Sequence, residues 1–202
     1  SHGIFGYSES DDAYFEALQG WRRRRHQFEI EKKWVVKTPG IVLALAMAVK
    51  AYTKCGDGVL LQSPVYYPFS EVIRDQIVRE NIKLFLLCNP HNPVGRVWTE
   101  EELLHIGQIC LRHGVTVVSD EIHHDFIFKG QHHVFAGLSD ALADITVTCT
   151  SPSKTFNVAG LQASNIIIKN ENLRKAFIHQ LDAAGVSQIG LMGLVACQAA
   201  YA

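Results

Sequence analysis

A lysine with small hydroxyl neighbours follows an apolar stretch in the last third of the chain, in the run Ser151-Pro152-Ser153-Lys154. At the end of a buried strand a lysine amine can be partly desolvated, which lowers its pKa and frees it to attack a carbonyl. Lys154 is therefore a candidate nucleophile. For this motif taken alone, a solvated strand end is the alternative.

An aspartate, Asp120, ends the apolar run Val117-Val118-Ser119. A carboxylate at the tip of a buried strand needs a positive partner to offset the cost of burial. A protonated pyridine nitrogen is one such partner, because a buried carboxylate keeps the ring protonated and able to accept electrons. A helix N-cap or a metal ligand is the alternative interpretation of Asp120.

Two further segments have features that suit a cofactor. The two prolines and the glycine of Asn89–Gly95 predict a tight turn that fixes the orientation of the Asn92 amide. The amide could donate to a ring oxygen, or the turn could have a structural role alone. Thr38-Pro39-Gly40 precedes a predicted helix, whose free N–H groups and dipole favour a phosphate. The sequence contains neither the P-loop pattern nor the glycine pattern of dinucleotide sites.

These segments together supply an amine, a partner for a ring nitrogen, a donor for a ring oxygen and a phosphate site. The hydroxyls of Ser151 and Ser153 add two candidate donors to the phosphate. Pyridoxal 5′-phosphate (PLP) requires these four groups in its binding site. The combination therefore predicts this cofactor, although each segment alone is weak evidence for it.

The elements that must position these residues alternate between strand-like and helix-like segments. The strand-like runs are nearly continuous in apolar and β-branched residues, which is typical of strands buried on both faces of a parallel sheet. The predicted strands are Val59–Val65, Ile82–Cys88, Val115–Ser119, Ile145–Thr150 and Ala163–Lys169, and the predicted helices are Asp11–His26, Ile41–Lys54, Thr99–His113, Glu171–Ala183 and Ser187–Ala200. We expect an α/β fold, a three-layer αβα domain with a mostly parallel sheet, whose ligands bind beyond the carboxyl ends of the strands.

The helix Thr99–His113 has the clearest boundaries. Thr99 and Glu102 predict a capping box, and Gly114 stands where a left-handed residue ends a helix. Its inner face is expected to consist of Leu103, Ile106 and Cys110, with Leu111 as a further candidate.

The composition excludes several classes of protein. The 202 residues suffice for one large domain or two small ones, and 48% hydrophobic with 19% charged residues is typical of a globular protein. A net charge of −1 gives no general attraction to nucleic acid or to an anionic membrane, and no apolar stretch is long enough to span a bilayer. The five cysteines form no C-x-x-C pair and the chain shows no signal peptide, so we expect reduced thiols and a cytoplasmic protein.

For two groups of polar residues we favour a structural role over a binding site. Arg22–Arg25 occupy four successive positions around a predicted helix, so a solvated helix end is favoured over a nucleic-acid patch, with a subunit contact left open. His123 and His124 would point to opposite faces of a strand and make poor co-ligands. We therefore predict no metal site.

The ordered set of motifs resembles the fold-type I PLP-dependent enzymes of the aminotransferase class I/II superfamily, and more closely the cystathionine β-lyase (carbon–sulfur lyase) subgroup. The similarity covers almost the whole chain and is more specific for the cofactor than for the reaction. The runs that carry it are His2–Tyr7, Ser63–Phe69, Cys88–Trp98, Val118–His123 and Ser151–Asn157.

The resemblance implies roles for individual residues around the ring of PLP. Lys154 would hold the cofactor as a Schiff base and later carry a proton. Asp120 would pair with the pyridinium nitrogen, Asn92 would bind the ring oxygen, and Tyr66 would stack on the ring face.

The same resemblance implies a phosphate site made by the backbone amides of Gly40 and Ile41 with Ser151 and Ser153. Tyr7 would reach the phosphate of a neighbouring subunit. The expected assembly is therefore a homodimer with shared active sites.

Two positions depart from the typical aminotransferase pattern. His123, which we count among the cofactor-binding residues, stands where many of these enzymes have a tyrosine, and Gln162 stands where many have an arginine. Both changes are compatible with the lyase subgroup.

The chain is shorter than the family. We interpret residues 1–202 as an incomplete PLP-binding large domain. An N-terminal segment, a stretch near residues 75–82 and the C-terminal small domain, which supplies the arginine for the substrate carboxylate, are expected to be absent.

The favoured function is a carbon–sulfur β-lyase that cleaves cystathionine or related cysteine S-conjugates to a thiol, pyruvate and ammonia. A class I/II aminotransferase is the first alternative. A regulatory or inactive protein that binds the cofactor is the second.

Overall fold

The computed structural model describes residues 6–7, 9–62, 77, 80–186 and 188–202. Its centre is a six-stranded sheet with the order β1-β6-β5-β4-β3-β2. The strands are β1 (Val35–Thr38), β2 (Gly58–Leu61), β3 (Ile82–Cys88), β4 (Thr116–Asp120), β5 (Thr146–Thr150) and β6 (Ser164–Ile167).

The sheet is mixed but mostly parallel. Strands β2, β3, β4 and β5 are parallel neighbours, whereas β6 runs antiparallel to both β5 and β1. Crossover segments that contain α4 (Glu100–His113) and α5 (Asp140–Asp144) connect β3 to β4 and β4 to β5. No crossover helix separates β5 from β6, so that connection stays at one edge of the sheet.

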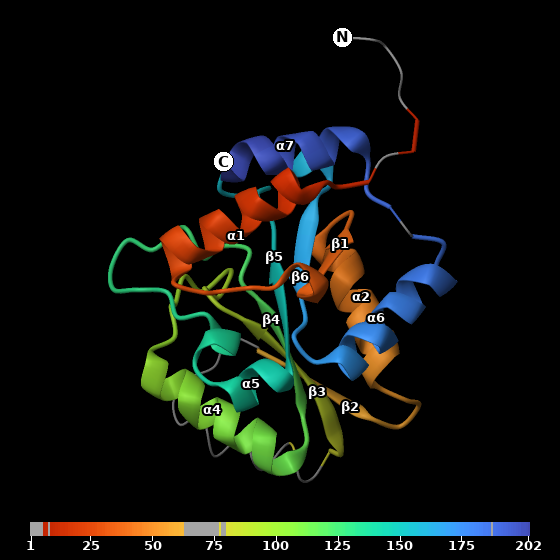
Figure 1. The fold of residues 1–202 in the computed structure, drawn as a ribbon. Helices are drawn as coiled ribbons and strands as arrows, with labels where there is room; N and C mark the ends of the chain where they lie inside the picture. Colours follow the sequence, from red (N-terminus) through yellow and green to blue (C-terminus); the bar gives the residue numbers. More distant parts are fainter. Residues whose placement is uncertain (1–5, 8, 63–76, 78–79, 187) are drawn as a thin grey trace.

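Helices cover both faces of the sheet (Figure 1). α2 (Ile41–Tyr52) and α6 (Glu171–Ala183) pack together on one face. The opposite face carries α4 and α5, together with the paired helices α1 (Asp12–His26) and α7 (Leu191–Tyr201). The α/β, three-layer prediction is therefore confirmed.

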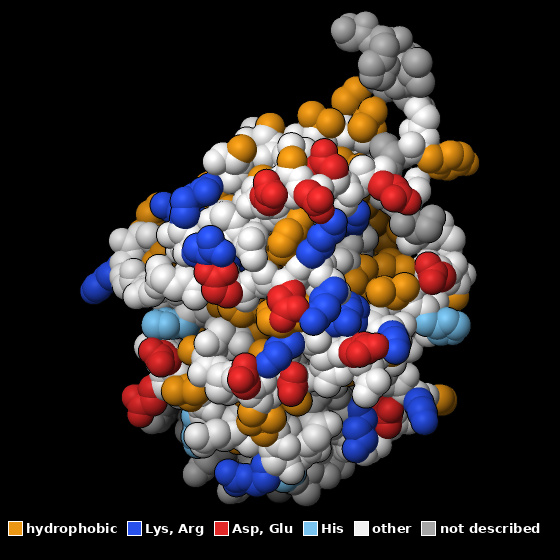
Figure 2. Space-filling model, viewed as in Figure 1, with side chains coloured by type: hydrophobic (Ala, Val, Ile, Leu, Met, Phe, Trp, Pro, Cys, Tyr) orange, Lys and Arg blue, Asp and Glu red, His pale blue; other side chains and the backbone are white. Residues whose placement is uncertain are grey.

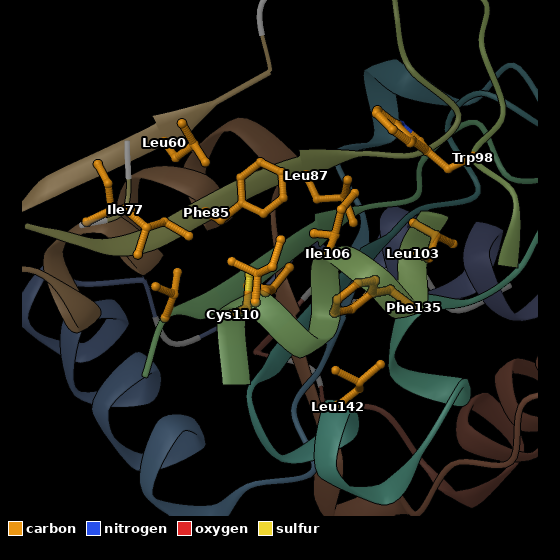
Figure 3. Close-up of a cluster of buried hydrophobic side chains, with 14 residues drawn as sticks. Leu60, Ile77, Phe85, Leu87, Trp98, Leu103, Ile106, Cys110, Phe135 and Leu142 are labelled. Atoms are coloured by element: carbon orange, nitrogen blue, oxygen red, sulfur yellow. The ribbon is translucent and has the colours of Figure 1, made fainter. Parts of the chain in front are cut away.

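Alternate strand residues supply two separate cores, because successive side chains point to opposite faces. Val117 packs toward α4, while its neighbour Val118 packs toward α2. Figure 3 shows the α4 side of this arrangement, where Phe85 and Leu87 of β3 face Ile106 of α4. All of these side chains are buried, which explains why the strands are apolar without alternation.

The helix α4 has the caps that its sequence predicts. The Thr99 hydroxyl accepts from the Glu102 amide, the Glu102 carboxylate accepts from the Thr99 amide, and Gly114 is left-handed with φ 65°. The inner-face prediction is confirmed for Leu103, Ile106 and Cys110 but is wrong for Leu111, which is exposed.

Most other element predictions agree with the structure to within a few residues. The prediction for β3 matches at both ends, and the outer half of Val59–Val65 lies outside the described residues. Two short elements, β1 and α5, were not predicted. Four or five residues are too few to establish a clear hydrophobic period.

The prediction that Arg22–Arg25 form a solvated helix end is wrong for Arg22. Its guanidinium is buried beside the Glu121 carboxylate, 3.4 Å away, and lies over the ring of Phe28. Arg23 does pair with Glu29 at the surface. Four successive residues wrap around a helix, so one of them must face inward.

The surface carries mixed charge. Figure 2 shows acidic and basic side chains interspersed over the face in view, rather than gathered by sign. Among the described residues, none of the helices combines the length and the apolar character needed to cross a membrane.

Candidate active site

The polar residues that end three neighbouring strands meet at one edge of the sheet. Cys88 of β3 pairs in register with Asp120 of β4, and Asp120 pairs with Cys149 of β5. The residues that follow these strand ends therefore lie side by side. This alignment brings the Asn92 turn, Asp120 and the Lys154 turn together.

A cavity of about 310 Å³ lies at this edge. This volume is in the range of small-molecule sites. Eight of the predicted site residues contribute to its wall, namely Gly40, Ile41, Asn92, Asp120, His123, Ser151, Ser153 and Lys154. Tyr66 lies outside the described residues, and Tyr7 is fully exposed and does not line the cavity.

Asp120 is a partly buried carboxyl with an incomplete set of partners. Burial raises the pKa of Asp120 to about 6, although the backbone N–H of Ile122, 3.1 Å from Oδ1, and the charge of Lys154 act in the opposite direction. A raised carboxyl pKa means that the charged form lacks stabilisation. A cation in the cavity would supply that stabilisation.

The start of α2 offers free backbone donors to the cavity. Gly40 is the N-cap, it makes no side-chain cap, and its φ of 152° is a conformation that suits glycine. The first-turn N–H groups at Ile41 and beyond therefore have no side-chain cap, and they carry the positive end of the helix dipole. This geometry suits a phosphate.

The turn that contains Asn92 is closed by backbone hydrogen bonds. The His91 amide donates to the Arg96 carbonyl over 2.8 Å, and the Gly95 amide donates to the His91 carbonyl over 2.7 Å. Asn92 is exposed at the cavity wall.

Asn89, which the sequence analysis did not single out, is fully buried behind this turn. Its backbone N–H donates to the Asp120 carbonyl, and its side-chain Oδ1 accepts from the backbone N–H of Trp98. Asn89 thus ties the end of β3 to the end of β4. The proline-rich context of Asn89 was the only signal available in the sequence.

The Lys154 turn is held at its base. The Ser151 hydroxyl donates to the Ala163 carbonyl over 2.7 Å and accepts from the Ser153 amide. The hydroxyl hydrogen of Ser151 is therefore already used, which leaves Ser153 as the freer of the two predicted phosphate donors. Lys154 itself is exposed, so the partial burial suggested by its strand-end position is not found in this single chain.

His123 and Gln162 also face the cavity. Burial, and then the charge of Lys154, lower the pKa of His123. The Nδ1 atom of His123 is buried without a hydrogen-bond partner among the described residues. A neutral imidazole with an unused nitrogen can accept or donate one hydrogen bond to a ligand.

A buried polar network lies behind the cavity, and sequence analysis missed it. Glu121 is completely buried and accepts from Ser119, His132, Arg22 and the Phe135 amide. Burial acts to raise the pKa of Glu121, but the His132 hydrogen bond and the nearby positive charges outweigh it and lower the pKa to about 2.

A second group, which we call the Asp125 cluster, consists of Asp125, His26, His124 and Thr155. Asp125 Oδ1 lies 3.0 Å from His26 Nε2, and Oδ2 accepts from the Thr155 hydroxyl over 2.6 Å. His124 Nε2 lies 3.2 Å from Oδ2. Burial favours the protonated form of Asp125, yet these contacts outweigh it and hold the pKa of the carboxyl well below its usual range.

The side chains of both histidines of the Asp125 cluster are buried. Burial lowers the pKa of His26 to about 4, so its imidazole is neutral at neutral pH. A neutral imidazole has a single N–H, and the Asp125 carboxylate requires that hydrogen on His26 Nε2. Because His26 lies 99 residues away along the chain, no local pattern could predict this contact.

The cluster also bears on the metal prediction. His123 and His124 lie in a turn after β4 and not on a strand, so the premise of our argument against them was wrong. Among the described residues, His26, His124 and Asp125 form the one group close enough to share a metal ion. Their mutual contacts account for the group without an ion, and the absence of a metal site stays a prediction.

The residues at the cavity fit PLP. Asp120 lacks the full cationic partner that a protonated ring nitrogen would supply, and the α2 N-terminus lacks an acceptor for its first N–H groups. Lys154 brings an exposed amine to the same cavity. These three observations match a ring nitrogen, a phosphate and an aldehyde.

Comparison with known proteins defines the class. The family model for aminotransferase class I and II matches residues 75–190. The chain belongs to this family.

Individual relatives narrow the similarity further. The chain is 43% identical to cystathionine β-lyase PatB of Bacillus subtilis over 99% of its own length. It superimposes on cystalysin from Treponema denticola, which contains PLP, with a TM-score of 0.93 and 38% identity. It superimposes on a PLP-bound carbon–sulfur lyase from Staphylococcus hominis with a TM-score of 0.87 and 36% identity, and both superpositions cover 98% of this chain. The chain covers 59%, 57% and 56% of these three proteins, so it spans less than two thirds of each.

Proposed function

We propose that the protein is a PLP-dependent carbon–sulfur β-lyase that cleaves cystathionine or a related cysteine S-conjugate to a thiol, pyruvate and ammonia. The observation that carries the proposal is the cavity in which Lys154, Asp120, Asn92 and Gly40 meet. The 43% identity to a cystathionine β-lyase supports the reaction type.

PLP, when bound, accepts the electron pair that is released as a proton leaves Cα of the amino-acid substrate. The Lys154 amine is the base that takes this proton. Asp120 keeps the ring nitrogen protonated, and Asn92 and His123 offer hydrogen bonds at the rim. The N–H groups at the start of α2 hold the phosphate, with the Ser153 hydroxyl as an additional donor.

A class I/II aminotransferase is the second candidate, favoured by the family model that matches the chain. It would use the same amine and the same carboxylate. The two candidates differ in the fate of the substrate's amino group: an aminotransferase must pass it to a keto-acid acceptor to complete its cycle, whereas a β-lyase releases it as ammonia and needs no acceptor.

An assay without any keto acid separates the two candidates. Purified protein with PLP is incubated with cystathionine, and pyruvate and free thiol are measured together. The lyase predicts equal amounts of both products. Consumption of cystathionine that depends strictly on an added keto acid, with no release of thiol, would refute the lyase and support the aminotransferase.

Two variants test the role of Lys154 in the same assay. Lys154→Ala removes the amine, and Lys154→Arg keeps a positive charge that cannot act as a base at neutral pH. Both are expected to lose turnover. Full activity in either variant would refute the assignment of Lys154.

The assembly and the extent of the whole protein are part of the proposal. We propose a homodimer in which Tyr7 reaches the phosphate of the neighbouring subunit, because Tyr7 is fully exposed in the single chain. Tyr66 is proposed to stack on the ring. Residues 1–202 are proposed to be the large domain of a longer enzyme, with the substrate-carboxylate arginine elsewhere.

All five cysteines are unpaired, which supports a cytoplasmic location. Neither a nucleic acid nor a membrane is proposed as a partner.

A further inference from the structure

Among the contacts of the described residues, one side-chain hydrogen bond connects the Lys154 turn to the segment that follows Asp120. Thr155, the residue after Lys154, donates its hydroxyl to Asp125 Oδ2 over 2.6 Å. Asp125 belongs to the turn that follows Asp120 and also contains His123. The bond therefore joins the segment that presents the amine to the segment that presents the carboxylate.

The acceptor of this bond is itself fixed. The Asp125 side chain is 4% exposed. Its other oxygen, Oδ1, lies 3.0 Å from Nε2 of His26, in the last turn of α1. His124 lies 3.2 Å away and meets the His26 ring edge to face, with centroids 4.1 Å apart. A buried carboxylate with partners on both oxygens has little freedom to move.

Within the part of the chain that the structure describes, the other contacts of the Lys154 turn do not involve the Asp120 segment. The Phe156 ring packs against the rings of Trp21 and Tyr201. The Phe156 amide donates to the Pro152 carbonyl, and the Val158 amide donates to the Ser153 carbonyl, each over 3.0 Å. Together with the bond from Ser151 to Ala163, these contacts shape the turn and attach it to the residue before β6. Among the contacts of the described residues, the hydrogen bond from Thr155 is the only one in which a side chain of this turn fixes the orientation of the turn relative to β4.

We infer that Asp125 and Thr155 are positioning residues, and that their hydrogen bond sets the place of the Lys154 amine relative to the Asp120 carboxylate. The inference rests on the proposed function, since it concerns the amine that attaches PLP. Without the bond, the turn keeps its shape but loses its fixed relation to the ring-nitrogen partner.

Thr155→Val tests the bond, because valine keeps the shape of threonine and lacks the hydroxyl. Thr155→Ser is the matched control that keeps it. For the purified protein we expect Thr155→Val to bind PLP about tenfold more weakly, the effect of one hydrogen bond to a charged group. Thr155→Ser should stay within about twofold of the unchanged protein, since its hydroxyl can form the same bond.

Two further measurements separate positioning from general damage. Visible circular dichroism of bound PLP reports a fixed ring orientation, and its signal should fall in Thr155→Val and be retained in Thr155→Ser. The melting temperature of the PLP-free protein checks the fold of both variants. Asp125→Asn, which weakens the acceptor, should repeat the loss of dichroism.

Each outcome has one interpretation. Unchanged PLP affinity and dichroism in Thr155→Val would overturn the inference and leave the proposed function intact. Equal losses in the valine and serine variants would also overturn it, because the hydroxyl would not be the cause. If the protein without substitutions binds PLP but makes no pyruvate, the lyase is refuted and the positioning role is unaffected. An unchanged protein that binds no PLP would refute both.

Discussion

Replacing Asp120 by asparagine should stabilise the PLP-free protein at neutral pH. The pKa of Asp120 is raised from 3.8 to about 6 in the folded chain. A shift of roughly two units corresponds to about 3 kcal/mol of unfavourable free energy for the charged form. Asparagine cannot ionise, and its side-chain oxygen can still accept from the Ile122 amide, which lies 3.1 Å away in the native protein.

The sign of the effect depends on pH. Between about pH 4 and pH 6 the unfolded chain ionises Asp120 while the folded chain retains the proton, so native stability falls as pH rises. Above about pH 6 the penalty is complete. The Asp120→Asn variant should therefore match the native protein near pH 4 and exceed it by about 3 kcal/mol at pH 8.

Urea unfolding of the PLP-free proteins at both pH values measures the difference directly. Asp182→Asn, at an exposed aspartate, is the control and should change stability by less than about 0.5 kcal/mol. Adding PLP should reverse the order, because the proposed pairing with the ring nitrogen requires the carboxylate. A gain from Asp120→Asn that is the same at pH 4 and pH 8 would refute the reasoning.

Three other substitutions have defined outcomes. Arg22→Met should cost about 3–5 kcal/mol in urea unfolding, since it leaves the buried Glu121 charge without its cation; a cost below about 1 kcal/mol would contradict this role. Thr99→Ala should cost about 1 kcal/mol by removing the capping box of α4, and Thr99→Ser should restore most of it, as thermal melts can check. Gly40→Ala should weaken PLP binding far more than pyridoxal binding in equilibrium titrations, because strain at φ 152° displaces the phosphate donors; equal losses for both ligands would count against a phosphate site at α2.

The parts of the fold that could be predicted are those with a local cause. The strand β3 is apolar except for the exposed Lys83 because both of its faces are covered, and α4 carries both of its caps in its own sequence. The antiparallel direction of β6 could not be predicted, since strand composition does not encode which neighbour a strand pairs with.

The candidate site divides in the same way. Eight predicted residues line one cavity because each lies at the end of a strand, in the loop after a strand or at the start of a helix that the sequence makes visible. Arg22 and His26 were missed because their partners, Glu121 and Asp125, lie 99 residues away in the chain. Contacts of that kind depend on how helices pack on the sheet, which no periodic pattern records.

The antiparallel pairing of β5 with β6 has a consequence for the order in which the site forms. Thr150 pairs with Asn165, and Ser151 bonds to Ala163, so the loop that contains Lys154 closes through contacts between residues near in sequence. Loops of that length close rapidly, whereas parallel pairing must wait for a crossover to fold. We therefore expect the amine-bearing half of the site to assemble early, and the Asp120 carboxylate to join it when β4 pairs with β5.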